Sequence, residues 1–317
     1  MPQMRIVFDN IIYSLQRYGG ISEVWNQLLS RARADRDLTI TELDYREAMP
    51  YRKLERYRIP DYRATEPTIF HSSYFRVLPQ QGVRNVTTVH DLTYHFYRRG
   101  LAKAVHLWEE ERALRHSEAI ICISENTKRD LLRCYPWVEE QRITIVPNGV
   151  SEVFRPLEKV EKQGYLLYVG NSTADYKRYD VAQAVAELTG LKLVTAKGVT
   201  AEELNRMYNE ALCLLYPSDY EGFGLPILEA QRAGCPVIAQ RASSIPEVIG
   251  RNGLMVSHDT PQRMAQEMAD LVRQLKSQPT EQIVRDGLEN AARYSWDKTY
   301  EMTKQVYETI YHNYHIQ

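Results

Sequence analysis

Two glutamates, Glu221 and Glu229, flank a glycine-rich turn in the sequence Tyr-Glu-Gly-Phe-Gly-Leu-Pro-Ile-Leu-Glu-Ala. Gly222 and Gly224 would allow the backbone to approach a ligand closely, and Pro226 favours the first position of a helix. The N–H groups of a first helical turn attract an anion such as a phosphate. Glu229 would lie about one turn further in, within reach of a sugar hydroxyl. A phosphate-binding turn beside such a carboxylate suits a nucleotide sugar.

The segments on either side of this turn predict a βαβ unit. An apolar run over residues 212–217 precedes the turn, and Gly234 ends the helix before a second apolar run over residues 236–239. The turn therefore lies at the carboxyl end of a strand, where open α/β sheets bind ligands. Two glutamates at this spacing would also fit a core helix with exposed acids, but the flanking strands favour a ligand site.

Alternating strands and helices are predicted along the whole chain. The predicted strands are residues 5–9, 67–71, 85–90, 119–123, 142–146, 165–170 and 191–196, besides the two above. The predicted helices are residues 21–33, 102–116, 124–134, 179–188, 201–210, 262–276, 281–293 and 296–314. This alternation is typical of parallel, doubly wound sheets. The polar stretch at residues 156–164 is the expected linker between two of them.

The chain resembles the large family-four class of retaining glycosyltransferases. The motif around Glu221 carries this resemblance, together with Ala-Gly-Cys-Pro-Val-Ile-Ala at residues 233–239 and Ser-Ser-Ile-Pro-Glu-Val at residues 243–248. It implies the α/β GT-B architecture, in which two Rossmann-like, doubly wound domains face each other and a C-terminal helix crosses back to the first. A sugar would be transferred from a nucleotide donor without an essential metal and with retained anomeric configuration.

Three domain segments are expected. Residues 1–156 would form the acceptor-side domain, residues 157–298 the nucleotide-sugar domain, and residues 299–317 the helix that packs back on the first domain.

Two further groups of residues are expected to hold the donor diphosphate. Gly19 and Gly20 lie between a strand and a helix, where the resemblance implies close backbone approach and an N–H donated by Gly20; an ordinary turn is the alternative. Lys177 matches a diphosphate-binding lysine of relatives. Asn171 stands where relatives usually carry a basic residue, and Arg178 is the candidate replacement. Cations at a helix start are disfavoured unless an anion binds between them, which favours a ligand site over a solvated pair.

The resemblance also implies a role for each donor-side residue. Lys177, Gly20 and the helix start at Leu225 would stabilise charge on the leaving diphosphate. Glu229 would accept hydrogen bonds from the ribose hydroxyls. The departing phosphate oxygen would take the acceptor's proton, which explains why no catalytic base stands out in the sequence.

Further candidates would act on the sugar. Glu221 and the N–H groups of Gly222 and Phe223 would position it. His90, in His-Asp-Leu after a strand, would touch the sugar or the incoming hydroxyl, although a lone histidine is often structural. His71 ends a neighbouring strand and is a weaker candidate. We expect His90, Lys177 and Glu221 to be the catalytic residues.

Composition restricts the class of protein. The 317 residues suffice for two domains, and the net charge of −1 gives no general attraction to nucleic acid. We expect the chain to open on a strand, without a signal peptide, and no apolar run is long enough to span a bilayer. Four cysteines without a close pair indicate reduced thiols. Asp219 and Glu221 lack a third ligand nearby, so no metal site is expected.

The expected protein is a cytoplasmic enzyme of surface polysaccharide biosynthesis without a cofactor. Its partners would be a nucleotide sugar, GDP-mannose or a UDP-hexose, and a glycan or lipid-linked acceptor. Residues 51–63 are basic and aromatic, and fit either a solvated surface or a patch that contacts the acceptor or the membrane surface. A nucleotide-sugar epimerase and a non-catalytic nucleotide-sugar-binding subunit are the alternatives.

Overall fold

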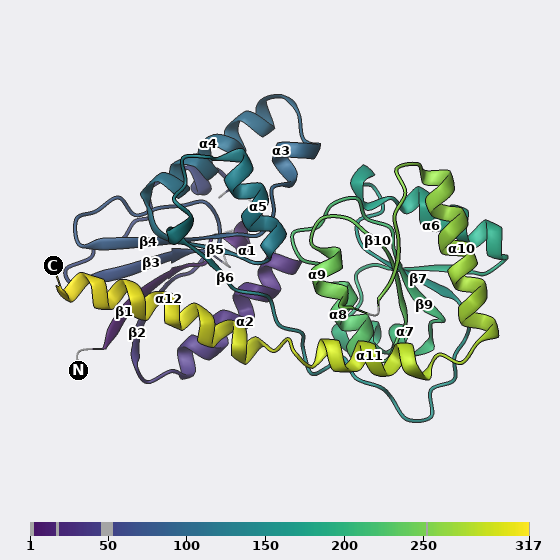
Figure 1. Cartoon of the computed structure of the whole chain (residues 1–317). Helices are drawn as coiled ribbons and strands as arrows, with labels where there is room; N and C mark the ends of the chain where they lie inside the picture. Colours follow the sequence, from purple (N-terminus) through teal and green to yellow (C-terminus); the bar gives the residue numbers. More distant parts are fainter. Residues whose placement is uncertain (1–2, 17–18, 46–52, 252, 317) are drawn as a thin grey trace. The chain divides into compact units, whose positions relative to one another are not determined.

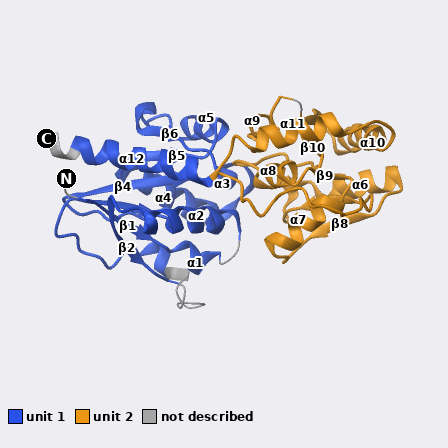
Figure 2. Cartoon of the chain, turned by 90° about the horizontal axis from the view of Figure 1, so that it is seen from below, with its two compact units in different colours: residues 1–148, 296–317 blue, residues 149–295 orange. Residues whose placement is uncertain are grey.

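The computed structural model describes residues 3–16, 19–45, 53–251 and 253–316 (Figure 1). The chain divides into two compact units (Figure 2). Unit 1 comprises Met1–Asn148 and Trp296–Gln317, and unit 2 comprises Gly149–Ser295. No helix in the described part of the chain is both long and apolar enough to cross a membrane.

Unit 1 contains a six-stranded parallel sheet in the order β2-β1-β3-β4-β5-β6. Its strands are β1 Met4–Asp9, β2 Leu38–Leu43, β3 Thr68–Ser72, β4 Val83–Val89, β5 Ser117–Cys122 and β6 Ile143–Ile145. Its helices are α1 Ile12–Leu15, α2 Gly20–Ala34, η1 Lys53–Tyr57, α3 Thr93–Tyr97, α4 Gly100–His116, α5 Glu125–Cys134, η2 Glu140–Arg142 and α12 Trp296–Ile316. Strand β1 pairs with β2 on one side and β3 on the other, so the winding of the sheet reverses between β1 and β3.

One face of this sheet is covered by α2 and α12, which lie side by side (Figure 1). Phe8 of β1, Trp25 of α2 and Tyr307 of α12 belong to the same buried apolar cluster. The C-terminal helix thus completes the core of unit 1, as the resemblance implied. Helix α5 begins where predicted, because the Ser124 hydroxyl accepts a hydrogen bond from the Thr127 N–H at 3.0 Å.

Unit 2 contains a five-stranded parallel sheet in the order β11-β10-β9-β7-β8. Its strands are β7 Leu166–Val169, β8 Leu193–Ala196, β9 Cys213–Tyr216, β10 Val237–Gln240 and β11 Leu254–Val256. Its helices are η3 Asp175–Lys177, α6 Tyr179–Thr189, α7 Ala201–Glu210, α8 Leu225–Arg232, α9 Ile245–Ile249, α10 Pro261–Ser277 and α11 Glu281–Ala291. The winding of this sheet reverses between β7 and β9.

The polar stretch at residues 156–164 lies within unit 2, and the two units divide ahead of it, between Asn148 and Gly149. The Leu157 N–H donates to Asn209 Oδ1 on α7, and the Gln163 N–H donates to the carbonyl at the end of α7, both at 2.8 Å. These bonds hold the stretch on α7. The second division falls between Ser295 and Trp296, so all of α12 belongs to unit 1.

Candidate active site

Three loops meet at the carboxyl ends of β7, β9 and β10, which are neighbours in the sheet of unit 2. The Asp219 N–H, after β9, donates to the Tyr176 carbonyl, after β7, at 2.8 Å. The Glu221 N–H donates to the Ser243 hydroxyl, after β10, at 2.7 Å. The loops after β7 and β9 flank the point where the winding reverses, which is where doubly wound sheets bind ligands.

Lys177 and Glu221, two of the three expected catalytic residues, form an ion pair in these loops. Lys177 Nζ lies 2.7 Å from both carboxylate oxygens of Glu221. The side chains are only 19% and 10% exposed, so water screens the pair weakly. Burial and the neighbouring Glu221 raise the pKa of the Tyr216 hydroxyl. Glu221 thus supplies the counter-charge for the weakly exposed Lys177 ammonium.

The glycine turn before α8 has the geometry that its sequence predicts. Gly224 has φ +114°, and a Cβ at this position would lie 3.2 Å from the end of Ile227. Helix α8 begins at Leu225, so Pro226 is its second residue, one place later than predicted. No side-chain hydrogen bond caps this helix start. Its N-terminal dipole favours an anion.

Ser243 and Ser244 hold the turn from the loop after β10. The Ser244 hydroxyl lies 2.9 Å from the Glu221 carbonyl oxygen and 2.8 Å from that of Phe223. Ser243 adopts φ +46°, which is unfavourable for a residue with a side chain. The sequence motif includes both serines but does not reveal that they fix the turn. The Phe223 ring is buried against Tyr294, so only its backbone can serve a ligand.

Glu229, the expected ribose acceptor, is oriented by a buried tyrosine. Tyr208 Oη on α7 donates to Glu229 Oε2 at 3.0 Å. Tyr208 is fully buried. Its burial is the main cause that raises the pKa of its hydroxyl, and the negative charge of Glu229 raises this pKa further. No sequence pattern pairs these two residues, because strand β9 and the glycine turn separate them.

Asn171 and Arg178 bind other partners in the loop after β7. Asn171 Oδ1 accepts from the N–H and hydroxyl of Thr173 at 3.0 Å and 2.8 Å, which shapes an exposed turn. Arg178 lies 3.0 Å from the carboxylate of Asp180 and 3.6 Å from that of Asp219. The proposed replacement for the missing cation is therefore bound by two acids.

His90, the third expected catalytic residue, lies in unit 1, where it lines a pocket of about 250 Å³. The other residues of this lining are Ile12, Leu15, Gln16, Ile21, Arg56, Ser73, Tyr74, Phe75, Thr88, Asp91, Tyr94 and His106. Most of them follow β1, β3 or β4, beside the point where the winding of this sheet reverses. Burial lowers the pKa of His90 and of His106 to about 4, so both rings are neutral near pH 7.

Aromatic rings form one wall of the unit 1 pocket. Tyr94 stacks on His106 with 3.7 Å between ring centroids and 9° between planes. Tyr74 Oη lies 2.9 Å from His106 Nδ1. Aromatic rings with hydroxyl and imidazole groups at their edges suit a sugar, which has both apolar faces and hydroxyls.

Gly19 and Gly20 lie at the start of α2, next to this pocket. Helix α2 begins at Gly20, and no side-chain hydrogen bond caps it. Gly19 has φ +154°, and a Cβ there would lie 2.0 Å from Gln16 Nε2, a residue of the pocket lining. The positive φ and the lack of room for a Cβ both favour glycine at position 19.

His71, the weaker histidine candidate, is a core residue. It is 1% exposed, with Nδ1 2.6 Å from Tyr307 Oη and Nε2 2.9 Å from Thr88 Oγ1. Burial lowers its pKa to about 3. The interpretation of His71 as a site residue is wrong, because both ring nitrogens are used in joining β3 to α12 and β4.

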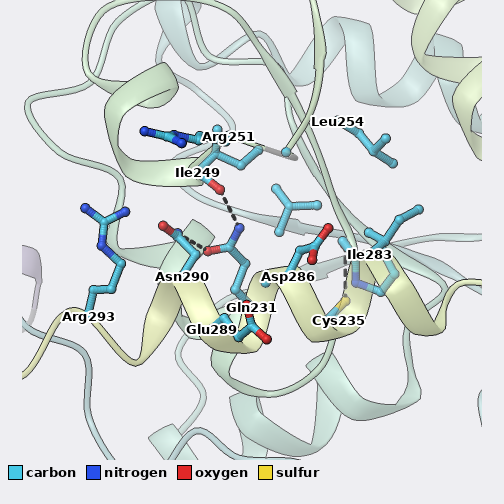
Figure 3. Close-up of a pocket in the computed structure, with 14 residues that line it drawn as sticks. Gln231, Cys235, Ile249, Arg251, Leu254, Ile283, Asp286, Glu289, Asn290 and Arg293 are labelled. Carbon is cyan, nitrogen blue, oxygen red and sulfur yellow. Dashed lines mark hydrogen bonds between the residues drawn. The ribbon is translucent and has the colours of Figure 1, made fainter.

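A separate pocket of about 310 Å³ lies where β10 and β11 begin, at the opposite edge of the unit 2 sheet from the loops above (Figure 3). Asn290 Nδ2 on α11 donates to Gln231 Oε1 at 2.7 Å and to the Val248 carbonyl at 2.8 Å. These bonds join α11 to α8 and α9. The expected site residues do not line this pocket.

In the described ranges, no three His, Cys, Asp or Glu side chains lie together as metal ligands would. The four cysteines are free thiols, and burial raises the pKa of Cys122 to about 12.

Comparison with known proteins agrees with this geometry. Residues 43–153 match the model described as Glycosyltransferase Family 4, and residues 142–274 match Glycosyl transferases group 1. The chain belongs to the family-four glycosyltransferases. The similar proteins and structures below fit this assignment.

Among curated relatives, the O-antigen chain mannosyltransferase B of Escherichia coli is 27% identical over 292 residues, which span 76% of this chain and 74% of the relative. Among solved structures, sucrose-phosphate synthase from Thermosynechococcus elongatus has a TM-score of 0.78 at 16% identity and covers 98% of this chain and 100% of its own. HepE of Anabaena, solved with UDP and glucose, has a TM-score of 0.68 at 12% identity and covers 97% and 100%. The family-four glycosyltransferase therefore has the GT-B fold.

Proposed function

We propose that the chain is a metal-independent, retaining hexosyltransferase of surface polysaccharide biosynthesis. It would transfer a mannose or glucose type of sugar from a nucleotide donor to a glycan or lipid-linked acceptor. The observation that carries the proposal is the joining of Lys177, Glu221 and the start of α8 at the point where the winding of the unit 2 sheet reverses. The E. coli relative, an O-antigen mannosyltransferase, supports the polysaccharide setting, including lipopolysaccharide.

In the proposed donor site, the diphosphate binds at the start of α8 beside Lys177. The helix dipole and the ammonium stabilise the charge that develops as the sugar–phosphate bond breaks. Glu221, held 2.7 Å from Lys177, keeps the ammonium in place and accepts a hydrogen bond from a hydroxyl of the sugar. The carboxylate of Glu229, oriented by Tyr208, accepts hydrogen bonds from the ribose hydroxyls.

In the proposed acceptor site, the unit 1 pocket binds the sugar that receives the transferred hexose. A neutral His90 can accept a hydrogen bond from a hydroxyl without adding charge. The start of α2 at Gly20 would offer N–H groups to a phosphate. A retaining transfer in which the leaving phosphate oxygen takes the acceptor's proton needs no separate base.

The donor sugar is the finer part of the proposal. The mannosyltransferase relative favours GDP-mannose, and the HepE structure with UDP and glucose keeps UDP-hexoses as the alternative. Thermal shift against GDP-mannose and UDP-hexoses ranks them, because a ligand that binds only the folded state raises the melting temperature.

To test the proposal, the purified chain is incubated in excess EDTA with the donor that gives the largest thermal shift, with and without a lipid-linked glycan acceptor. Transfer should continue in EDTA, release nucleoside diphosphate and give a product with the donor's anomeric configuration by NMR. A new epimer from donor alone would indicate an epimerase. Binding without turnover of any donor would indicate a non-catalytic subunit, and loss of transfer in EDTA would refute metal independence.

A further inference from the structure

Helix α4 buries two acidic residues and exposes two large apolar ones. Glu109 and Glu110 are 2% and 0% exposed, whereas Leu101 and Trp108 are 80% and 53% exposed. With the exposed Ala104, the two apolar residues are spaced by three and four positions and lie on one face of the helix. A globular helix normally buries its apolar face and exposes its acids.

The buried acids fix which face of α4 points outward. Glu109 accepts two hydrogen bonds from Arg56, at 3.1 Å and 2.8 Å. The carboxylate of Glu110 accepts one from Tyr135 Oη at 2.8 Å and lies 2.7 Å from His95 Nε2. Turning the helix to bury its leucine and tryptophan would break these bonds and leave buried acids unpaired.

The exposed apolar side chains continue beyond α4. Phe96 and Tyr97 of α3 are each 40% exposed, and Trp137 after α5 is 37% exposed. Ring contacts connect Phe96 with Trp137, because His95 lies against Phe96 and edge-on to Tyr135, which lies edge-on to Trp137. We call this set the α3–α4 surface: Phe96, Tyr97, Leu101, Trp108 and Trp137. Helices α3 and α4 lie across the unit 1 sheet from α12 (Figure 1).

Cations surround the α3–α4 surface. Arg98 and Arg99 are exposed between α3 and α4. Arg112 lies 5.7 Å from the ring centre of Trp108, and Arg115 lies 4.2 Å from that of Trp137. The surface is therefore aromatic and basic together, the composition that binds the headgroup layer of anionic membranes.

We propose that the α3–α4 surface docks unit 1 on an anionic lipid bilayer, with Leu101 and Trp108 inserted among the headgroups. A second copy of this chain fits less well, because a symmetric dimer would bring the same arginines of both copies together. The inner sides of α3 and α4 carry Tyr94 and His106 of the unit 1 pocket. On the proposed function, docking would therefore present a lipid-linked acceptor to that pocket.

Vesicle flotation of the full chain tests the docking without any substrate. Wild type should float with phosphatidylglycerol–phosphatidylcholine vesicles at low salt and much less with phosphatidylcholine alone or at high salt. The double variant L101S/W108S should lower the vesicle-bound to free ratio about tenfold or more. L188S, which changes a leucine of α6 that is 43% exposed, is the matched control and should bind as wild type does.

Three results would overturn the docking. They are failure of wild type to float with the anionic vesicles, equal flotation of L101S/W108S and wild type, and a light-scattering mass that falls from dimer to monomer in L101S/W108S. R98Q/R99Q should weaken binding to the anionic vesicles and leave the weak binding to phosphatidylcholine vesicles unchanged. Melting temperatures check that each variant is folded. Because no sugar donor is present, a negative result leaves the transferase proposal intact.

Discussion

At the scale of single residues, the central feature is the pair of Lys177 and Glu221. A weakly exposed ammonium needs a counter-charge, and Glu221 supplies it with both carboxylate oxygens at 2.7 Å. A diphosphate arriving at the start of α8 would bring further negative charge to the same ammonium. Lys177 thus has a structural partner before binding and a proposed ligand afterwards.

Replacing Lys177 by alanine should lower kcat by about 10²–10³, because one preorganised donor to the leaving group is lost. Steady-state kinetics with the preferred donor measure this loss. Lys276→Ala, at an exposed lysine of α10, is the control and should behave as wild type. Near-normal kcat in Lys177→Ala would show that the leaving group is stabilised elsewhere.

Glu229→Ala should mainly raise the donor KM, with a smaller change in kcat, because it removes a contact to the nucleotide rather than to the leaving group. Tyr208→Phe should raise the donor Kd in the same direction but by only about fivefold, because it removes one hydrogen bond that orients Glu229. Steady-state kinetics with the donor measure the KM and kcat, and calorimetric titration with the nucleoside diphosphate measures the Kd of both variants. Unchanged affinity in both variants would contradict the ribose assignment.

At the scale of elements, the site depends on loops that different strands supply. The glycine turn and the start of α8 could be predicted, because their signals are local: glycines, a proline and flanking apolar runs. The contact between Lys177 and Glu221 could not, since 44 positions separate the two residues and the β7–β9 pairing brings them together. The role of Ser244 likewise depends on β10 lying beside β9.

Some elements left weak signals in the sequence. Strand β2 was not predicted, because only Leu38 among its residues is buried and the alternating Thr-Ile-Thr-Glu pattern gives no apolar run. His71 was misread because its position at a strand end suggests a ligand site, whereas Tyr307, 236 positions away, determines its environment. Local patterns predict elements and turns, but partners distant in sequence determine what a buried polar side chain does.

Ser244→Ala should lower the free energy of unfolding of unit 2 by about 1–3 kcal/mol, because the carbonyls of Glu221 and Phe223 lose a buried donor. Urea denaturation measures the change in stability, and native-state hydrogen exchange in the 221–230 segment shows whether it is local to the turn. Ser277→Ala, which removes a hydroxyl at the exposed end of α10, should have little effect. Equal stability of the two variants would mean that Ser244 does not hold the turn.

At the scale of the whole molecule, the chain leaves unit 1 after Asn148, builds unit 2 and returns as α12. Tyr307 is fully buried and contacts His71, and Lys304 lies 2.8 Å from the Asp35 carboxylate. Unit 1 therefore lacks part of its core until the end of the chain has folded onto it.

The stability of unit 1 should fall as pH drops below about 6.5, the pKa of an unfolded histidine. Folding lowers the pKa of His71 to about 3, so between these values the unfolded chain binds a proton that the folded chain excludes. Stability from this group is complete above the unfolded value and decreases with acid. The expected slope is about 1.4 kcal/mol per pH unit for one histidine.

Urea denaturation at pH 5, 6 and 7 should show a smaller decrease for His71→Gln than for wild type. The comparison isolates His71, because other titrating groups are common to both proteins. The variant is expected to be less stable at pH 7, so the difference in slope is the informative quantity. Parallel curves would show that His71 does not exclude the proton.

The most direct measurement of the central claim is a crystal structure of the chain soaked with the nucleoside diphosphate that gives the larger thermal shift, GDP or UDP. The diphosphate should lie beside Lys177 at the start of α8, with its ribose hydroxyls on the Glu229 carboxylate. A diphosphate bound elsewhere, for example in the pocket beside Asn290, or a soak that leaves no nucleotide in the crystal, would contradict the account.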